Sequence, residues 1–204
     1  MLWHSKKLGF IHIPKCGGSS VNYAMMEAQP NNWQNRTWMR GLKVESMWKN
    51  TTVFSQHATY DQYAFTHPHY DYVAQVRNPI TRFESAYKHL YRLGLVHRDY
   101  YVWSSEVIQP LSRGDWVSAI DSHSKYIDMV DTNPGYDLGF LFKPQWHYVR
   151  PEVEIHKIED GTIWKRLGLK RQHRNSSYIS GLNSDHVKTE IYDLYEKDFT
   201  LLRY

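Results

Sequence analysis

Apolar and polar positions change their period several times along the 204-residue chain. Short runs rich in apolar, β-branched or aromatic residues have the length of strands, and between them apolar positions recur at spacings of three and four, as on one face of a helix. No repeat and no linker rich in Ser, Gly or Pro interrupts this pattern, so we expect a single domain over residues 1–204. Strands that alternate with helices predict an α/β fold with a mostly parallel sheet covered on both faces. The predicted strands are Leu8–Ile13, Thr51–Phe54, Tyr72–Val76 and Val153–Ile158, and the predicted helices are Ser19–Ala28, one that begins at Pro79, Thr162–Leu167 and one over Val187–Leu202.

Two long stretches, residues 30–50 and 97–134, show neither period, and we expect long surface excursions there. Both are rich in Trp and Tyr. Such rings on loops beside a cleft could stack on sugar faces, or they could be core residues, which is the more common fate of these side chains. The rings in question belong to Trp33, Trp38, Trp48, Tyr100, Tyr101 and Trp103.

Composition narrows the class of protein. The chain is 41% hydrophobic and 15% aromatic, which excludes intrinsic disorder, and its single cysteine excludes an internal disulfide and any Cys-rich metal module. No apolar run reaches the length of a membrane span, so we expect a soluble protein of a reducing, cytoplasmic compartment. A net charge of +4 suits an anionic ligand but falls short of the basic stripe of a nucleic-acid binder.

The first motif with chemical meaning is the glycine loop, residues 15–18, which follows Pro14 at the end of the first predicted strand and leads into its helix. A strand that feeds a helix through glycines directs backbone N–H groups and the positive helix end toward one point, which favours phosphate. Lys15 adds an ammonium, and Ser19 and Ser20 add hydroxyls. The lysine precedes the glycines, unlike the order in nucleotide hydrolases. Alternatively, Gly17 and Gly18 make only a tight turn.

A second cationic motif follows the strand Tyr72–Val76. Arg77 stands at the carboxyl end of this strand, where a nucleoside triphosphatase often carries a magnesium-binding aspartate, so no metal is implied. Ser85, two helical turns further on, could supply a hydroxyl to an anion held by Arg77. Alternatively, the arginine caps the sheet and the small serine allows close helix packing.

Together, PKCGGSS and RNPITRFESAY resemble the two signature motifs of sulfotransferases that use 3′-phosphoadenosine 5′-phosphosulfate (PAPS), most closely the carbohydrate sulfotransferases, including the uronyl 2-O type. The resemblance implies a P-loop-like three-layer fold, PAPS as cofactor, adenosine 3′,5′-bisphosphate as product, no metal and a carbohydrate hydroxyl as acceptor. It also implies which residues bind the two ends of the nucleotide. These are Lys15, Cys16, Gly17, Gly18, Ser19 and Ser20 for the 5′-phosphosulfate, and Arg77 and Ser85 for the 3′-phosphate.

The resemblance extends more weakly over nearly the whole chain. It includes Gln145, the stretches 155–169 and 191–199, and Arg82, which on a helix could be structural. Arg174 belongs to a basic segment, 171–177, and similar late loops of the family close over the nucleotide. The chain departs from the family pattern at two positions, because Cys16 replaces a Thr or Ser and Asn78 replaces an Asp. We expect these changes to weaken cofactor binding. Cys16 beside a lysine and a helix start could instead be a reactive thiol.

Transfer of a sulfuryl group needs a cation at the leaving oxygen and a base at the acceptor hydroxyl. Lys15 is the candidate cation. His57 follows the predicted strand 51–54, and its position matches a histidine of the carbohydrate branch, so it is the candidate general base. His67 and His69 are alternatives as bases or as two metal ligands without a third nearby. Asp61 and Glu45 are further candidate bases.

Three other functions remain compatible with the motifs. A P-loop kinase of small molecules would need magnesium and ATP. A binding module that has lost catalysis would hold the nucleotide or an anionic glycan without transfer. Nucleic-acid binding would show steep salt dependence and little response to the bisphosphate.

Overall fold

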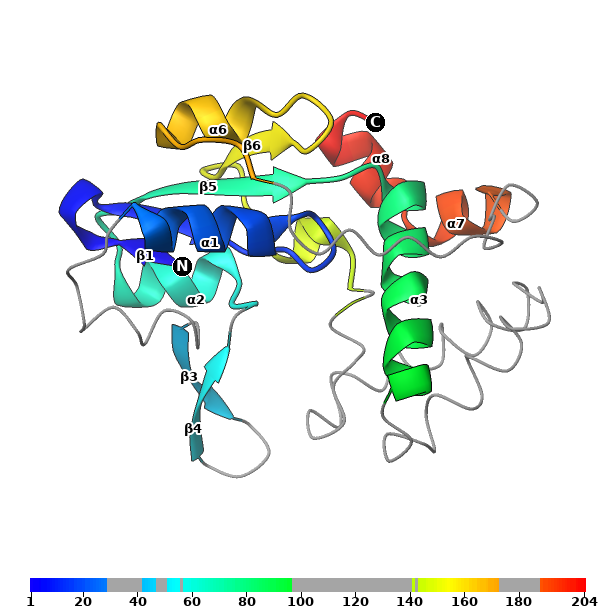
Figure 1. Ribbon diagram of the computed structural model, residues 1–204, viewed down its shortest axis with the longest axis horizontal. Coiled ribbons are helices and arrows are strands. Elements are labelled where there is room, and N and C mark those ends of the chain that lie inside the picture. Colours follow the sequence, from blue (N-terminus) through cyan, green and yellow to red (C-terminus); the bar gives the residue numbers. More distant parts are fainter. Residues whose placement is uncertain (29–41, 47–50, 56, 97–140, 142, 173–187) are drawn as a thin grey trace.

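The computed structural model describes residues 1–28, 42–46, 51–55, 57–96, 141, 143–172 and 188–204. A four-stranded sheet with the order β1-β2-β5-β6 forms its centre (Figure 1). The strands are β1 (Leu2–Trp3), β2 (Leu8–Ile11), β5 (Asp71–Val76) and β6 (Glu154–Lys157). β2, β5 and β6 run parallel, whereas β1 is antiparallel to β2 and is linked to it by the short helix η1 (His4–Lys6). The predicted mostly parallel sheet is confirmed.

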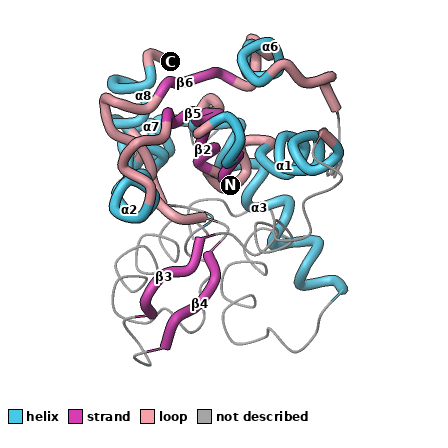
Figure 2. Tube along the Cα trace, turned by 90° about the vertical axis from the view of Figure 1, so that its left-hand side faces the viewer, coloured by secondary structure: helices cyan, strands magenta, loops and turns pink. Residues whose placement is uncertain are grey.

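Helices cover both faces of this sheet, as alternation along the strands requires. On one face, Leu8 and Phe10 of β2 pack with α1 (Gly18–Glu27) and α6 (Thr162–Leu167). On the other, Ile11 packs with α2 (Tyr60–Thr66) and with the segment around Tyr148. Figure 2 shows this arrangement from the side. The three-layer α/β fold is thus confirmed.

The helix predicted from Pro79 is present as α3 (Pro79–Val96) and leaves the carboxyl end of β5 (Figure 1). The single closing helix predicted over residues 187–202 is wrong. α7 (Lys188–Leu194) and α8 (Glu196–Leu202) are separate helices, because the backbone leaves the helical region at Tyr195 with φ −119° and ψ 22°. The buried Tyr195 ring packs on Phe83, and α8 turns toward the short helix η5 (Gln145–His147).

The strand predicted at residues 51–54 exists as β4 (Thr51–Ser55), but it does not join the central sheet. It pairs antiparallel with β3 (Leu42–Ser46) in a separate hairpin (Figure 1). β3 lies inside the stretch 30–50, for which the sequence predicts no strand. β-branched residues favour strand formation but do not determine which partner a strand selects. The stretch 97–134 lies outside the described residues.

No helix in the described part of the chain is both long enough and apolar enough to cross a membrane.

Candidate active site

At Gly17 and Gly18, the glycine loop has no room for a side chain. Gly17 has a left-handed backbone (φ +76°), and a Cβ there would lie 2.7 Å from Ile158 and 2.8 Å from Gln75. A Cβ on Gly18 would lie 2.0 Å from the ring of His12. Lys15 is also left-handed, with φ 66°, a conformation that costs about 1–2 kcal/mol in a residue with a side chain. Strain of this kind is common at ligand-binding loops.

The amino end of α1 adjoins this loop, because the helix begins at Gly18. α1 has no acidic residue in its first turn. Ser19 is half-buried, and Ser20 is buried, its backbone N–H donating to the Gly17 carbonyl over 3.0 Å. The positive end of α1 therefore suits an anion. The charge of Lys15 adds to the positive potential of this region, where it lowers the pKa of His12 and His57.

Arg77 lies at the same edge of the sheet as Lys15. β2 and β5 are parallel neighbours with Ile11 opposite Ala74, so both chains leave the sheet at one edge. The Arg77 guanidinium donates through Nε to Thr81 Oγ1 (3.0 Å) and through Nη1 to the Lys15 carbonyl (3.5 Å). Among the described residues, no carboxylate forms an ion pair with it. Within the described ranges, the guanidinium thus donates to neutral oxygen atoms.

Asn78 caps α3, and this explains why an amide can stand where the family has a carboxylate. Its Oδ1 accepts from the backbone N–H groups of Ile80 (3.0 Å) and Thr81 (3.5 Å). Asn and Asp are about equally good at this helix position. The backbone N–H of Asn78 donates to Glu159 Oε1 over 3.0 Å. The side chain of Asn78 therefore has a local structural role that the replacement preserves.

The side chain of Arg82 holds the backbone that leads into the glycine loop. The side chain is only 2% exposed, and it donates to the carbonyls of Pro14 (3.0 Å), Leu141 (3.1 Å) and Lys143 (2.8 Å). A guanidinium that is used in this way fixes backbone rather than ligand. The structure therefore supports the structural role suggested for Arg82.

His57 lies against the start of the glycine loop. Its Nδ1 is 2.8 Å from the carbonyl oxygen of His12, and the two imidazole rings are 4.6 Å apart. Because a carbonyl only accepts, Nδ1 carries the proton, and Nε2 is the basic nitrogen of the neutral ring. Burial lowers the pKa of His57 to about 4, against the opposing effect of this hydrogen bond. The imidazole is thus neutral at pH 7, and burial makes its Nε2 a weaker base than that of an exposed histidine.

The comparison with protein families agrees with this geometry. The sequence pattern of the Sulfotransferase family matches residues 2–127, more than half of the chain and including both cationic motifs. The chain belongs to the Sulfotransferase family. It is therefore a PAPS-dependent transferase, and its α/β fold is the one expected of this family. Neither the comparison with curated proteins nor that with solved structures found a match.

Cys16 of this sulfotransferase does not present its thiol to a ligand. The side chain is fully buried, and Sγ donates to Gln145 Oε1 over 3.1 Å. Burial raises the pKa of the thiol to about 12. The reactive-thiol interpretation is therefore wrong. The contact of Cys16 with the cofactor stays a prediction, and of this residue only the backbone is placed to make it.

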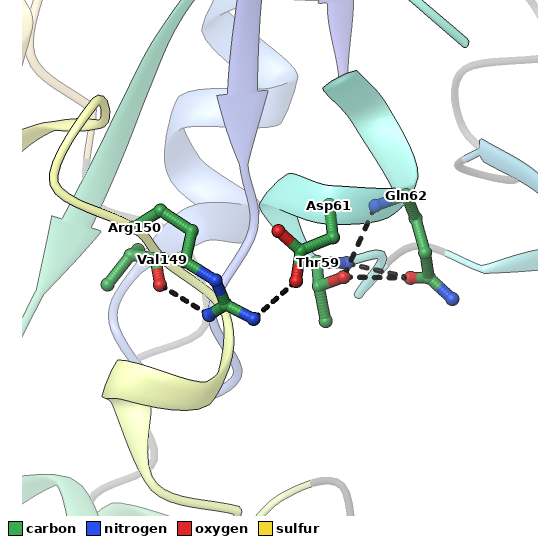
Figure 3. A network of polar contacts seen from close by, with 5 residues as sticks. All are labelled: Thr59, Asp61, Gln62, Val149 and Arg150. Atoms are coloured by element: carbon green, nitrogen blue, oxygen red, sulfur yellow. Dashed lines mark hydrogen bonds and ion pairs between the residues drawn. The ribbon is translucent and has the colours of Figure 1, made fainter. Parts of the chain in front are cut away.

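Asp61 is committed to a structural contact. Its carboxylate pairs with the guanidinium of Arg150, which also donates to the Val149 carbonyl over 2.8 Å (Figure 3). Beside it, Thr59 and Gln62 form a capping box that starts α2. Asp61 thus fastens α2 to the 149–150 backbone, which argues against it as a base. Glu45 lies on β3 opposite Thr52.

His67 and His69 lie at the wrong edge of the sheet. Both precede β5, which starts at Asp71, whereas Arg77 follows its last residue. A strand of this length separates the two edges by about 20 Å. His67 Nδ1 is 2.8 Å from Thr66 Oγ1, and its ring packs near His4. Within the described ranges, no group of three or more potential metal ligands is found.

The structure does not link Ser85 to the site, and it does not describe Arg174. Ser85 is half-buried on α3 and makes no side-chain hydrogen bond within the described part of the chain, so it is not linked to Arg77. Arg174 lies outside the described residues, as do the six Trp and Tyr residues singled out in the irregular stretches. Sequence reasoning found only a weak signal for Gln145 and none specific to Asp198, although both make buried hydrogen bonds at this site.

Proposed function

We propose that the enzyme transfers a sulfuryl group from PAPS to a hydroxyl of a carbohydrate, with Lys15 as the catalytic cation and His57 as the general base. PAPS, when bound, supplies a sulfuryl group on a phosphate leaving group, and adenosine 3′,5′-bisphosphate remains as product. No metal is required in this scheme. The glycine loop with Ser19 and Ser20 would hold the phosphosulfate end, and Arg77 with Ser85 the 3′-phosphate.

The convergence of Lys15 and Arg77 at one sheet edge carries this proposal. The guanidinium of Arg77 lies 3.5 Å from the carbonyl of Lys15, so both cationic motifs belong to one site. The donor set fits a nucleotide with phosphate groups at two positions. It combines two cations, the hydroxyls of Ser19 and Ser20, and a helix end with no acidic residue in its first turn. Lys15 would stabilise charge on the leaving oxygen, and Nε2 of His57 would take the proton of the acceptor hydroxyl.

Calorimetry with adenosine 3′,5′-bisphosphate in metal-free buffer tests the cofactor site. We expect the wild type to bind and Arg77→Ala to bind about ten- to hundredfold more weakly, as the loss of charge-assisted hydrogen bonds predicts. Arg166→Ala removes an equal charge from α6, where Arg166 pairs with Glu154, and should leave affinity unchanged. Absence of heat with the wild type would contradict the proposal. Binding without transfer of labelled sulfate across a glycan panel would indicate a module that has lost catalysis.

The pH dependence tests His57. Because its pKa is lowered to about 4, His57 stays neutral well below the ordinary value of 6.5. We therefore expect kcat/KM for the donor to show no acid limb with a pKa near 6.5, while His57→Gln lowers kcat by about 100-fold or more. His69→Gln, an exposed position at the opposite edge, is the matched control.

Thermal unfolding is measured at each pH, since the lowered pKa values of His57 and His12 reduce stability as pH falls below 6.5. If kcat/KM of the wild type falls on the acid side with a pKa near 6.5 while the protein stays folded, His57 is not the general base. Full activity of the His57→Gln variant would rule it out as well.

A further inference from the structure

Four segments distant in sequence meet at the side chain of Gln145. They are the glycine loop, the residue after β5, η5 itself and α8. The residue begins η5 and is fully buried, with 0% exposure. Its Oε1 accepts from the backbone N–H of Arg77 (2.9 Å) and from the thiol of Cys16 (3.1 Å). Its Nε2 donates to the Arg77 carbonyl over 2.8 Å. One amide thus contacts both cationic motifs.

The pairing with Arg77 resembles the pairing between strands. β5 ends at Val76, so Arg77 is the first residue beyond the ladder. Gln145 satisfies both its N–H and its C=O, as a neighbouring strand would. A glutamine amide offers a donor and an acceptor at once, whereas an ionised glutamate of the same length only accepts. The backbone from which the Arg77 guanidinium extends is therefore fixed by a side chain.

Asp198 fixes Gln145 in turn. It is fully buried on α8, and its two carboxylate oxygens accept from the backbone N–H groups of Gln145 and Trp146, both over 2.9 Å. Burial raises the pKa of this carboxyl, whereas Arg82 and these hydrogen bonds lower it. A buried acid in such a position is costly unless its hydrogen bonds are complete.

We propose that Gln145 is a positioning residue that holds Arg77 and the glycine loop in one arrangement for the nucleotide, and that Asp198 acts through Gln145. Both residues lie beyond the 2–127 match to the family. The inference rests on the proposed function, because it assumes that the two motifs bind one nucleotide.

Gln145→Met tests the positioning role, since methionine keeps the length but removes the donor and the acceptor. Two backbone groups of Arg77 lose their partner, and the Cys16 thiol keeps only its longer contact with the Pro14 carbonyl (3.6 Å). We therefore expect affinity for adenosine 3′,5′-bisphosphate to fall about tenfold or more. Cys16 is the only cysteine, which makes it a second readout. Its alkylation in the native, nucleotide-free protein should become about tenfold faster.

Leu167→Ala is the control for a general loss of stability. Leu167 is 2% exposed in the core on the α6 face, and its truncation costs about 2–5 kcal/mol. We expect a lower melting temperature but wild-type affinity. If wild type does not bind the bisphosphate, the proposed function fails. If wild type binds, and Gln145→Met binds equally and keeps Cys16 protected, only the positioning role is overturned.

A double-mutant cycle with Asp198→Asn tests the order of action. The new amide places an N–H against a backbone N–H, so the single variant should bind the bisphosphate more weakly. In the Gln145→Met background the same change should have little further effect on affinity. Additive effects would show that Asp198 does not act through Gln145. If Gln145→Met does not fold, Gln145→Glu replaces it. Protonation restores a donor to this variant, so its affinity relative to wild type should recover as pH falls, and a ratio of one at every pH would overturn the role.

Discussion

Replacing Lys15 by alanine is expected to lower the turnover of sulfuryl transfer by about 100-fold or more, as removal of a single oxyanion donor does in other enzymes. Lys15 is fixed in a left-handed backbone conformation beside the amino end of α1. Its charge lies close enough to His12 and to the candidate base His57 to lower the pKa of both imidazoles. The measurement is single-turnover transfer of labelled sulfate at saturating donor.

The control for this variant is Lys165→Ala, which removes a lysine from the exposed side of α6 and should leave turnover unchanged. A Lys15→Ala enzyme within about threefold of the wild-type rate would mean that another group neutralises the leaving oxygen. A fall in affinity for the donor with unchanged turnover would make Lys15 a binding residue only.

Gly18→Ala is expected to abolish measurable binding of adenosine 3′,5′-bisphosphate and to lower the melting temperature. The added Cβ would lie 2.0 Å from the ring of buried His12, which in turn packs against His57. Overpacking of this kind costs about 1–3 kcal/mol, and here the displaced groups are the glycine loop and the candidate base. Calorimetry and thermal unfolding measure the two effects.

Gly168→Ala is the control that distinguishes a clash in the glycine loop from backbone strain elsewhere in the protein. Gly168 has φ +67° and open space around its Cβ position, so alanine there introduces strain at the end of α6 without a clash. It should reduce stability and leave nucleotide affinity intact. A Gly18→Ala protein that binds the bisphosphate as tightly as the wild type would show that the His12 ring moves aside at no functional cost.

The parts of the fold that sequence could predict depend on short-range patterns. β2, the glycine loop and α1 follow each other directly, as do β5, Arg77 and α3, so apolar period and glycine position suffice to find them. Their meeting at one edge follows because parallel strands end together. The same rule pointed to His57, but its premise that the preceding strand belongs to the central sheet is wrong. That strand, β4, is not in the central sheet, yet His57 reaches the loop through the His12 carbonyl.

The contacts that sequence could not predict join distant segments. Whether the side chain at Cys16 faces a ligand or the interior is decided by Gln145, 129 positions away. The burial of Arg82 depends on carbonyls at positions 141 and 143, and the break at Tyr195 depends on packing against α3. Tertiary packing of this kind leaves no periodic signal in the chain.

The segment from Gln145 to Arg150 connects the two halves of the proposed chemistry. At one end of the segment, Gln145 holds the cationic motifs. At the other end, the Tyr148 carbonyl accepts from the backbone N–H of Tyr60 over 2.8 Å, and Arg150 pairs with Asp61. Tyr60 and Asp61 stand at the start of α2, shortly after His57 in the sequence. Insertions or deletions within this stretch would therefore change the span between proton acceptor and leaving group. Homologues with acceptors of different bulk should differ in its length.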